Sequence, residues 1–157
     1  MAGKYTAREK LHKDQQRRLV DIPKQMAKRI GSGKMLIPRP LDIDDMVRKV
    51  PKGKLTTIGR IRTRLAAKHG ANLTCPLCTG IFLRLTAEAS EEDQLAGRKK
   101  FTAYWRVVRD DGSLIDRFPD GVEGHAVRLE AEGHKVLPGK GKKLPKVDGL
   151  EDKLATL

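Results

Sequence analysis

Apolar residues recur at helical spacing through the middle of this chain, between two ends that are polar and basic. The first run predicts a short helix through Val50, which Asp42 or Asp44 can cap and which Pro51 ends. We therefore expect the folded part of the chain to begin near Leu41. The apolar stripe of this helix consists of Ile43, Met46, Val47 and Val50.

A second helix is predicted after a turn. The hydroxyl of Thr56 or Thr57 can cap its start, and Gly70 ends it. Its exposed positions carry several cations, which could meet phosphates or simply be solvated. The buried face is expected to consist of Ile58, Ile61, Leu65 and Ala66.

A third helix follows, with Asn72 or Thr74 as its cap and Pro76 tolerated in its first turn. Two helices joined by a short turn that contains glycine and asparagine predict a helix-turn-helix, whose second helix would lie against DNA. The candidate core positions of this third helix are Leu77, Ile81, Leu83 and Leu85.

The rest of the middle segment predicts a small β-hairpin and a last helix. Residues 101–109 are rich in β-branched and aromatic side chains, Asp111-Gly112 is a turn signal, and 113–115 can return as the partner strand. Residues 121–133 then predict a helix that Gly133 closes. The fold class expected is mainly α with a small β-hairpin.

The two ends are expected to be extensions of this domain. Residues 1–40 predict a basic N-terminal extension. Its apolar residues have a loose helical spacing, so it can become helical on a partner, although Pro23 interrupts that spacing. Residues 137–157 are rich in Pro, Gly and Lys and are expected to form a flexible basic tail. The domain itself is expected to span residues 41–136.

Charge is the main guide to the partner. Thirty-three Lys and Arg against twenty acidic residues give a formal net charge of +13, which favours binding to nucleic acid. Six aromatic residues are too few for stacking along a single strand. No apolar run reaches the length of about 18 residues that a membrane span needs, so no membrane partner and a cytoplasmic location are expected, on the nucleoid in a bacterium.

The two cysteines, Cys75 and Cys78, suit a reducing compartment and could be reactive at a helix N-terminus. Their spacing also raises a metal site, with His69, His125 or His134 as further ligands. Structural zinc needs four ligands, and one C-x-x-C pair is too little, so we predict no metal, no cofactor and no catalytic residue.

Two separated segments carry a resemblance to a known family. Residues 50–59 read V-P-K-G-K-L-T-T-I-G, and residues 106–133 begin R-V-V-R-D-D-G-S-L and end L-E-A-E-G. In this order and spacing, over about residues 41–136, they resemble the DNA-binding domain of the O6-alkylguanine-DNA alkyltransferase (methylated-DNA-protein-cysteine methyltransferase) family and its alkyltransferase-like relatives. The resemblance implies a winged helix-turn-helix-like alkyltransferase domain, here with basic terminal extensions.

The family's nucleophile is missing. In the enzymes a cysteine, activated through a water by a histidine and a buried glutamate, takes the alkyl group from a flipped guanine. Tyr104 stands at the cysteine position here and Trp105 at the histidine, and a phenol and an indole are not expected to perform that transfer. Glu132 stands at the glutamate position. The resemblance implies that Tyr104, Trp105 and Glu132 line a base pocket, or that the two rings fill it.

The resemblance also implies a set of DNA contacts. The family's tyrosine after the two threonines is Ile58 here, and its intercalating arginine falls at Pro76 or Leu77. Leu77 is then either an apolar wedge between base steps or a core residue. The expected DNA-binding residues are Thr56, Thr57, Arg60, Arg62, Arg64, Leu77, Arg84 and Arg106.

These residues leave three hypotheses open. The first is a non-enzymatic protein that binds double-stranded DNA, senses alkylated guanine and hands the lesion to other repair proteins. The second is an active alkyltransferase that uses Cys75 or Cys78. The third is a structural protein that binds RNA or a chromosome through its basic ends.

Overall fold

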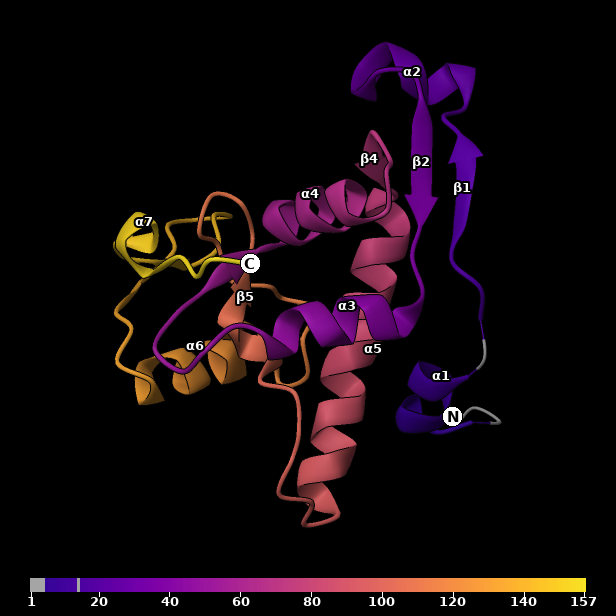
Figure 1. The fold of residues 1–157 in the computed structure, drawn as a ribbon. Coiled ribbons are helices and arrows are strands. Elements are labelled where there is room, and N and C mark those ends of the chain that lie inside the picture. The colour runs from indigo at the N-terminus through magenta and orange to yellow at the C-terminus, as the bar shows by residue number, and fades with distance from the viewer. Residues whose placement is uncertain (1–4, 14) are drawn as a thin grey trace.

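The computed structural model describes residues 5–13 and 15–157, and its centre is one long helix, α5 (Pro76–Leu95). Three shorter helices from earlier in the chain pack against α5 (Figure 1). They are α1 (Ala7–His12), α3 (Pro40–Arg48) and α4 (Ile58–Lys68). The expectation of a mainly helical fold is confirmed. None of the helices described is long and apolar enough to cross a membrane.

Helix α3 forms where its apolar stripe predicted it. The four stripe residues 43, 46, 47 and 50 are all buried. Asp42 lies at the third helical position, and its carboxylate accepts a hydrogen bond from the Arg39 N–H at 2.9 Å. Burial alone would raise the pKa of Asp42, but hydrogen bonds from Arg17 and Arg39 hold it well below its usual range.

Helices α4 and α5 lie where the sequence predicted the two helices of a helix-turn-helix. Thr57 caps α4, accepting from the Arg60 N–H at 3.2 Å, and Gly70 follows the helix with a positive φ of 69°. The connection contains the short strand β4 (Leu73–Thr74). The cap of α5 is Cys75, whose sulfur accepts from the Cys78 N–H, so Asn72 and Thr74 do not have the capping role expected of them.

Residues 101–115 do not form the hairpin that their composition predicted. They contain a 3-10 turn, η1 (Tyr104–Arg106), and then β5 (Val107–Val108), which pairs in parallel with β3 (Thr56–Thr57). The expected turn is present, since the Arg109 N–H donates to the Ser113 carbonyl at 2.9 Å. Because β3 lies just before α4, this pairing buries both valines beneath α4 and α5.

The N-terminal segment is folded, where an extension was expected. After α1 come β1 (Arg18–Asp21), α2 (Lys24–Ile30) and β2 (Lys34–Ile37). Strand β1 pairs antiparallel with β2, and β2 pairs in parallel with β4. The N-terminal segment thus joins the sheet that directly precedes α5.

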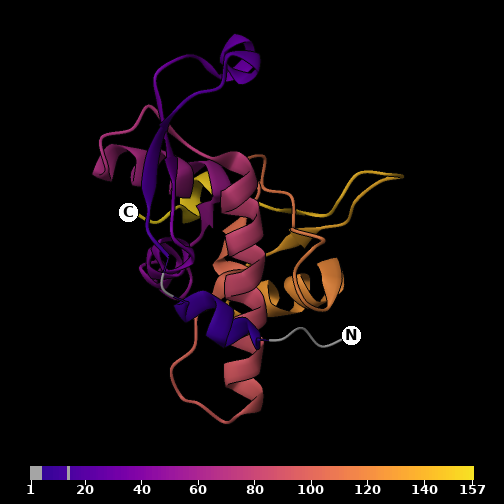
Figure 2. The ribbon, with the colours of Figure 1, turned by 90° about the vertical axis from the view of Figure 1, so that its right-hand side faces the viewer.

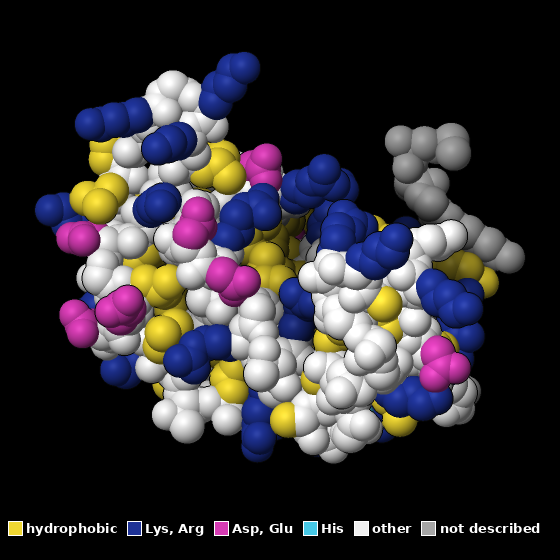
Figure 3. All heavy atoms as spheres, turned by 90° about the horizontal axis from the view of Figure 1, so that it is seen from above, with side chains coloured by type: hydrophobic (Ala, Val, Ile, Leu, Met, Phe, Trp, Pro, Cys, Tyr) yellow, Lys and Arg dark blue, Asp and Glu magenta, His cyan; other side chains and the backbone are white. Residues whose placement is uncertain are grey.

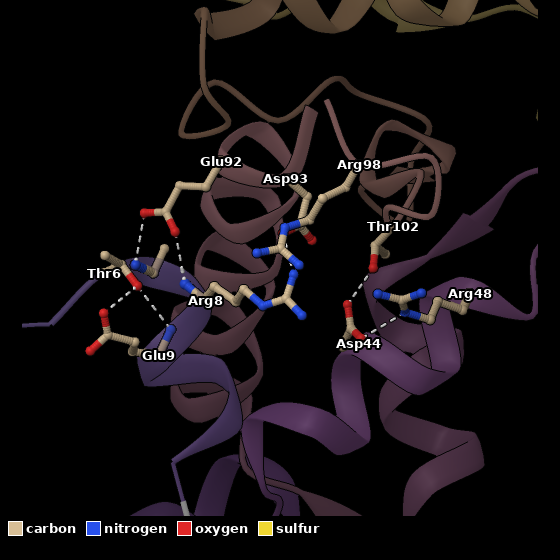
Figure 4. A network of polar contacts seen from close by, with 10 residues as sticks. Thr6, Arg8, Glu9, Asp44, Arg48, Glu92, Asp93, Arg98 and Thr102 are labelled. Carbon is tan, nitrogen blue, oxygen red and sulfur yellow. Dashed lines mark hydrogen bonds and ion pairs between the residues drawn. The ribbon is translucent and has the colours of Figure 1, made fainter. Parts of the chain in front are cut away.

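Helix α1 is held on α5 by polar contacts as well as by a small apolar cluster (Figure 4). Glu92 of α5 accepts from the N–H groups of Ala7 and Arg8 at 2.8 and 3.0 Å, which satisfies two donors of the first turn of α1. Arg8 also pairs with Asp93 at 2.8 Å. Six residues could not hold a helix alone, so these contacts explain why α1 forms here.

The C-terminal residues also carry structure, which corrects the expectation of a flexible tail. After α6 (Gly121–Ala131), β6 (Val136–Leu137) pairs antiparallel with β7 (Lys146–Val147) as a hairpin that projects from the body (Figure 2). Helix α7 (Leu150–Lys153) follows. The chain then returns to the core, where Leu55 exchanges backbone hydrogen bonds with Lys153 and Ala155, both at 2.8 Å.

Candidate nucleic-acid interface

The N-terminal half of α5 presents apolar side chains to solvent. Leu77 is 73% exposed and Ile81 is 55% exposed. Both were candidate core positions, so the structure corrects that expectation and leaves Leu77 free to act as a wedge. At about 100° per residue, these two leave the helix on the same side as Arg84, Glu88 and Glu91. One face of α5 therefore carries the exposed Leu77 and Ile81 near its N-terminal end and Glu91 near its C-terminal end.

Charge is unevenly distributed along this helix. Residues 76–87 contain no acid, whereas residues 88–93 contain Glu88, Glu91, Glu92 and Asp93. Arg84 lies between the two halves and pairs with Glu88 at 3.0 Å, with both side chains well exposed. A phosphate backbone can therefore approach the N-terminal half of α5 without meeting like charge, and is repelled from the C-terminal half.

Helix α4 carries further exposed cations. Arg60 and Arg64 are exposed, and no side chain in the described part of the protein pairs with either. Together with the last residues of the chain they line a cleft of about 1290 Å³. Seen from the end that carries α2, the surface is hollowed between two raised parts, with Lys and Arg side chains around the hollow (Figure 3).

Four of the eight residues expected to contact DNA are buried or form hydrogen bonds within the protein instead. Thr56 and Thr57 are buried in the β3–β5 pair, and the Thr57 hydroxyl is occupied by capping α4. The guanidinium of Arg62 donates to the Thr74 carbonyl at 3.1 Å and so holds the turn between α4 and α5. Arg106 faces the interior. Arg60, Arg64, Leu77 and Arg84 remain accessible, and their DNA contacts stay a prediction.

The two rings at the family's acceptor position are packed. Tyr104 is 2% exposed and Trp105 is 7% exposed. Their ring centroids lie 5.3 Å apart at 78°, and Tyr104 meets the edge of Phe118 at 4.9 Å. The two rings are thus packed against each other and against Phe118, and whether they line or fill a base pocket stays a prediction.

Glu91 and Arg128 cover these rings from the side of α5. The Tyr104 hydroxyl donates to Glu91, and Arg128 donates to the same carboxylate at 2.8 Å. The Arg128 guanidinium lies 4.6 Å from the centre of the Trp105 ring, a cation–π contact. Burial, and then the bond to Glu91, raise the pKa of Tyr104 above its ordinary value. Neither Glu91 nor Arg128 was among the site residues expected from the sequence, because no local pattern shows that α5 and α6 meet at these rings.

Glu132 has a structural partner. Its carboxylate receives two charge-assisted hydrogen bonds of 2.9 Å from Arg106, which also donates to the Val50 carbonyl at 2.9 Å. Burial would raise the pKa of Glu132, but the Arg106 guanidinium lowers it below its ordinary value. The Tyr104 hydroxyl does not bind Glu132, because it donates to Glu91. This ion pair ties the end of α6 to the segment between α3 and β3.

His125 fixes the backbone around the rings. Its Nε2 lies 2.8 Å from the Trp105 carbonyl, and its Nδ1 accepts from the Ile115 N–H at 3.1 Å. Nε2 therefore carries the proton, and burial lowers the pKa of His125 to about 4, which keeps the ring neutral. His125, which the sequence raised as a possible metal ligand, is thus a structural support.

The cysteines lie at the start of α5. Cys75 is buried, and burial together with the neighbouring Cys75 raises the pKa of the Cys78 thiol to about 11. Thirteen residues of helix separate Cys78 from Glu91, which is about 20 Å along the axis. Within residues 5–13 and 15–157, no three His, Cys, Asp or Glu side chains gather as a metal site would require.

We expect Cys78 to react slowly with iodoacetamide at pH 8. A pKa of about 11 leaves about one thiol in a thousand ionised there, so the rate should be about 100-fold below that of a free cysteine. Both cysteines stay in place, tandem mass spectrometry of the labelled peptide distinguishes Cys78 from Cys75, and the rate at Cys78 should still be rising above pH 9. A midpoint near pH 7 would contradict this assignment and revive Cys78 as a nucleophile.

Comparison with known proteins supports the fold. No family model matches the chain, and no curated protein is significantly similar to it in sequence. Two solved structures are similar, each over 75% of this chain and 94% of the other. S. pombe Atl1 in complex with damaged DNA containing O6-carboxymethylguanine aligns with 19% identity and a TM-score of 0.51. S. pombe ATL in complex with DNA aligns with 20% identity and a TM-score of 0.53. The chain therefore has the alkyltransferase-like fold that its motifs implied.

Proposed function

We propose that this protein is a non-enzymatic DNA-binding protein that senses alkylated guanine in double-stranded DNA. The observation that carries the proposal is the single face of α5. Its first two turns expose Leu77 and Ile81, and Glu91 on the same face holds Tyr104 and Arg128. The similar structures, one of them with an O6-carboxymethylguanine lesion, are complexes with DNA. A duplex laid on the first turns of α5 would reach toward the rings.

We infer that the protein does not transfer alkyl groups, because Tyr104 stands where the resemblance places the acceptor cysteine. Transfer needs an anionic nucleophile near the lesion, and the phenol of Tyr104 stays protonated because its pKa is raised. The thiol of Cys78 is also protonated and lies about 20 Å away along α5. We therefore assign Tyr104 to packing, and not to chemistry.

Recognition of a flipped base would require that the cover over Trp105 open. The Arg128–Glu91 pair is partly exposed, with side-chain exposures of 31% and 23%, so it contributes about 0–1 kcal/mol. The cation–π contact adds about 0.5–2 kcal/mol. The binding energy of a lesion can thus offset the displacement of Arg128, whereas removing Tyr104 from the core would cost about 3–5 kcal/mol. We propose that a base replaces the Arg128 guanidinium on the face of Trp105.

A sensor of this kind depends on other proteins. Because no residue of the site can remove the alkyl group, the lesion would persist until other repair proteins act on the complex. The protein would stay bound to the damaged site through the exposed face of α5, and the other repair proteins would then act on this complex. We place it with its DNA in the cytoplasm or nucleoid.

The direct test is competition binding at near-physiological salt. Matched duplexes with and without one O6-methylguanine compete for the protein, and the intact mass of the recovered protein is then measured. We expect tighter binding to the lesion and an unchanged mass. Equal affinity for both duplexes would overturn lesion sensing, and binding to RNA in preference to either duplex would overturn DNA binding. An added alkyl mass would overturn the non-enzymatic assignment.

Leu77 should be required for duplex binding. A Leu77→Glu substitution places an anion where the phosphate backbone would approach, and we expect at least a tenfold loss of affinity. Leu95 is 89% exposed at the other end of the same helix, so Leu95→Glu is the matched control and should bind with nearly normal affinity. Equal affinities of the two variants would show that DNA does not lie on the first turns of α5.

A further inference from the structure

The N-terminal segment β1–α2–β2, which we call the arm, is joined to the start of α5. Strand β2 pairs with β4, two residues before the helix begins. The Cys75 N–H donates to the Leu36 carbonyl at 2.9 Å, and the Asn72 N–H donates to the Lys34 carbonyl at 2.9 Å. The Asn72 side chain accepts from the Lys34 N–H at 2.8 Å. The arm is therefore positioned by the segment that joins α4 to α5.

Gly33 shows how closely the two parts fit. Its φ is +121°, and a Cβ there would lie 2.2 Å from Oδ1 of Asn72. Only glycine allows this approach of the arm to the turn that precedes α5.

A small apolar cluster of its own fixes the arm, and it accounts for both cysteines. Ile22 and Met35 of the arm are buried against Cys75, while Met26 and Cys78 are partly buried around them. The C-x-x-C pair thus serves as compact apolar filling between the arm and the first turn of α5.

The arm carries an excess of positive charge that the described residues leave largely unneutralised. Residues 18–37 contain five cations and one acid, Asp21. That acid pairs with Lys34. The other four cations are exposed and have no ion-pair partner among the described residues. They are Arg18, Lys24, Lys28 and Arg29.

Helix α2 contributes little to the core of the fold. None of its residues is buried, and in both ribbon views it lies beyond the N-terminal end of α5 (Figures 1 and 2). Three of the four unpaired cations are on α2. A helix that is exposed and basic, and that is held rigidly next to a candidate DNA-binding helix, fits a polyanion that continues past α5.

We propose that the arm is a second DNA contact, in which α2 binds the phosphate backbone of the same duplex beyond the segment that lies on α5. The inference rests on the proposed function, since it presumes that α5 faces a duplex. It goes further by assigning the N-terminal residues, which lie outside the motifs, a binding role. Because the contacts are to phosphates, the arm adds affinity without reading sequence.

The test compares two double variants of the full-length protein. Lys28→Ala/Arg29→Ala removes two charges from α2, and Lys99→Ala/Lys100→Ala removes two exposed charges just after the far end of α5. Affinity for an undamaged duplex of about 24 base pairs is measured from about 50 to 200 mM KCl. Removal of a single lysine–phosphate or arginine–phosphate interaction should reduce the slope of log K against log[KCl] by about 0.9. We expect the arm variant to bind more weakly, with a slope shallower by about 1 to 2, and the control to behave like the wild type.

A charge-preserving swap, Lys28→Arg/Arg29→Lys, should retain the wild-type slope, and melting curves should show that all variants fold, because α2 contains no buried residue. Wild-type slope and affinity in the arm variant would overturn the inference. Equal losses in the arm and control variants would also overturn it, because the effect would then follow net charge. If the wild type itself does not bind the duplex, the proposed function fails instead.

Discussion

The carboxylate of Glu91 is the contact on which the arrangement of the site depends. It accepts hydrogen bonds from Tyr104 of η1 and from Arg128 of α6, and its own backbone belongs to α5. The two bonds differ in strength, because the Arg128 pair is partly exposed and contributes about 0–1 kcal/mol, whereas the Tyr104 side chain is almost completely buried. They set the distance and rotation between α5 and the two rings. The open face at the start of α5 and the ring cluster consequently belong to one surface.

Several buried side chains around η1 act as structural supports. Glu132 binds Arg106 and ties α6 to the loop after α3, while His125 holds the backbone at Trp105 and Ile115. The rings of Tyr104 and Trp105 pack against each other. A reactive thiolate needs a polar, partly open environment, whereas the positions of Tyr104 and Trp105 are almost completely buried. The side chain that can leave this cluster at low cost is Arg128, because it is partly exposed.

The helices could be predicted from the sequence because their apolar residues recur at the period of about 3.6 residues that an α-helix imposes, as α3 and α4 show. The motifs also indicated the fold, which the two similar structures support. Long-range pairing could not be predicted: β5 pairs with β3 and not with residues 113–115, and the arm folds because β4 supplies a partner strand. Periodicity cannot show which apolar side chains are covered by another element. Leu77 and Ile81 were therefore expected in the core, but they are exposed. Nor could periodicity show that Arg106 points inward to a glutamate 26 residues later.

Trp105 is the only tryptophan of the chain, so its fluorescence reports directly on the cover over the candidate base pocket. The measurement is a titration of the protein with two duplexes that differ by one O6-methylguanine, each taken to saturation as judged by anisotropy of labelled DNA. If a flipped base displaces Arg128 and stacks on the indole, the lesion duplex should quench Trp105 emission clearly more than the unmodified duplex does. Identical emission with both duplexes at saturation would contradict the account, because the rings would then be a closed core and not a sensor.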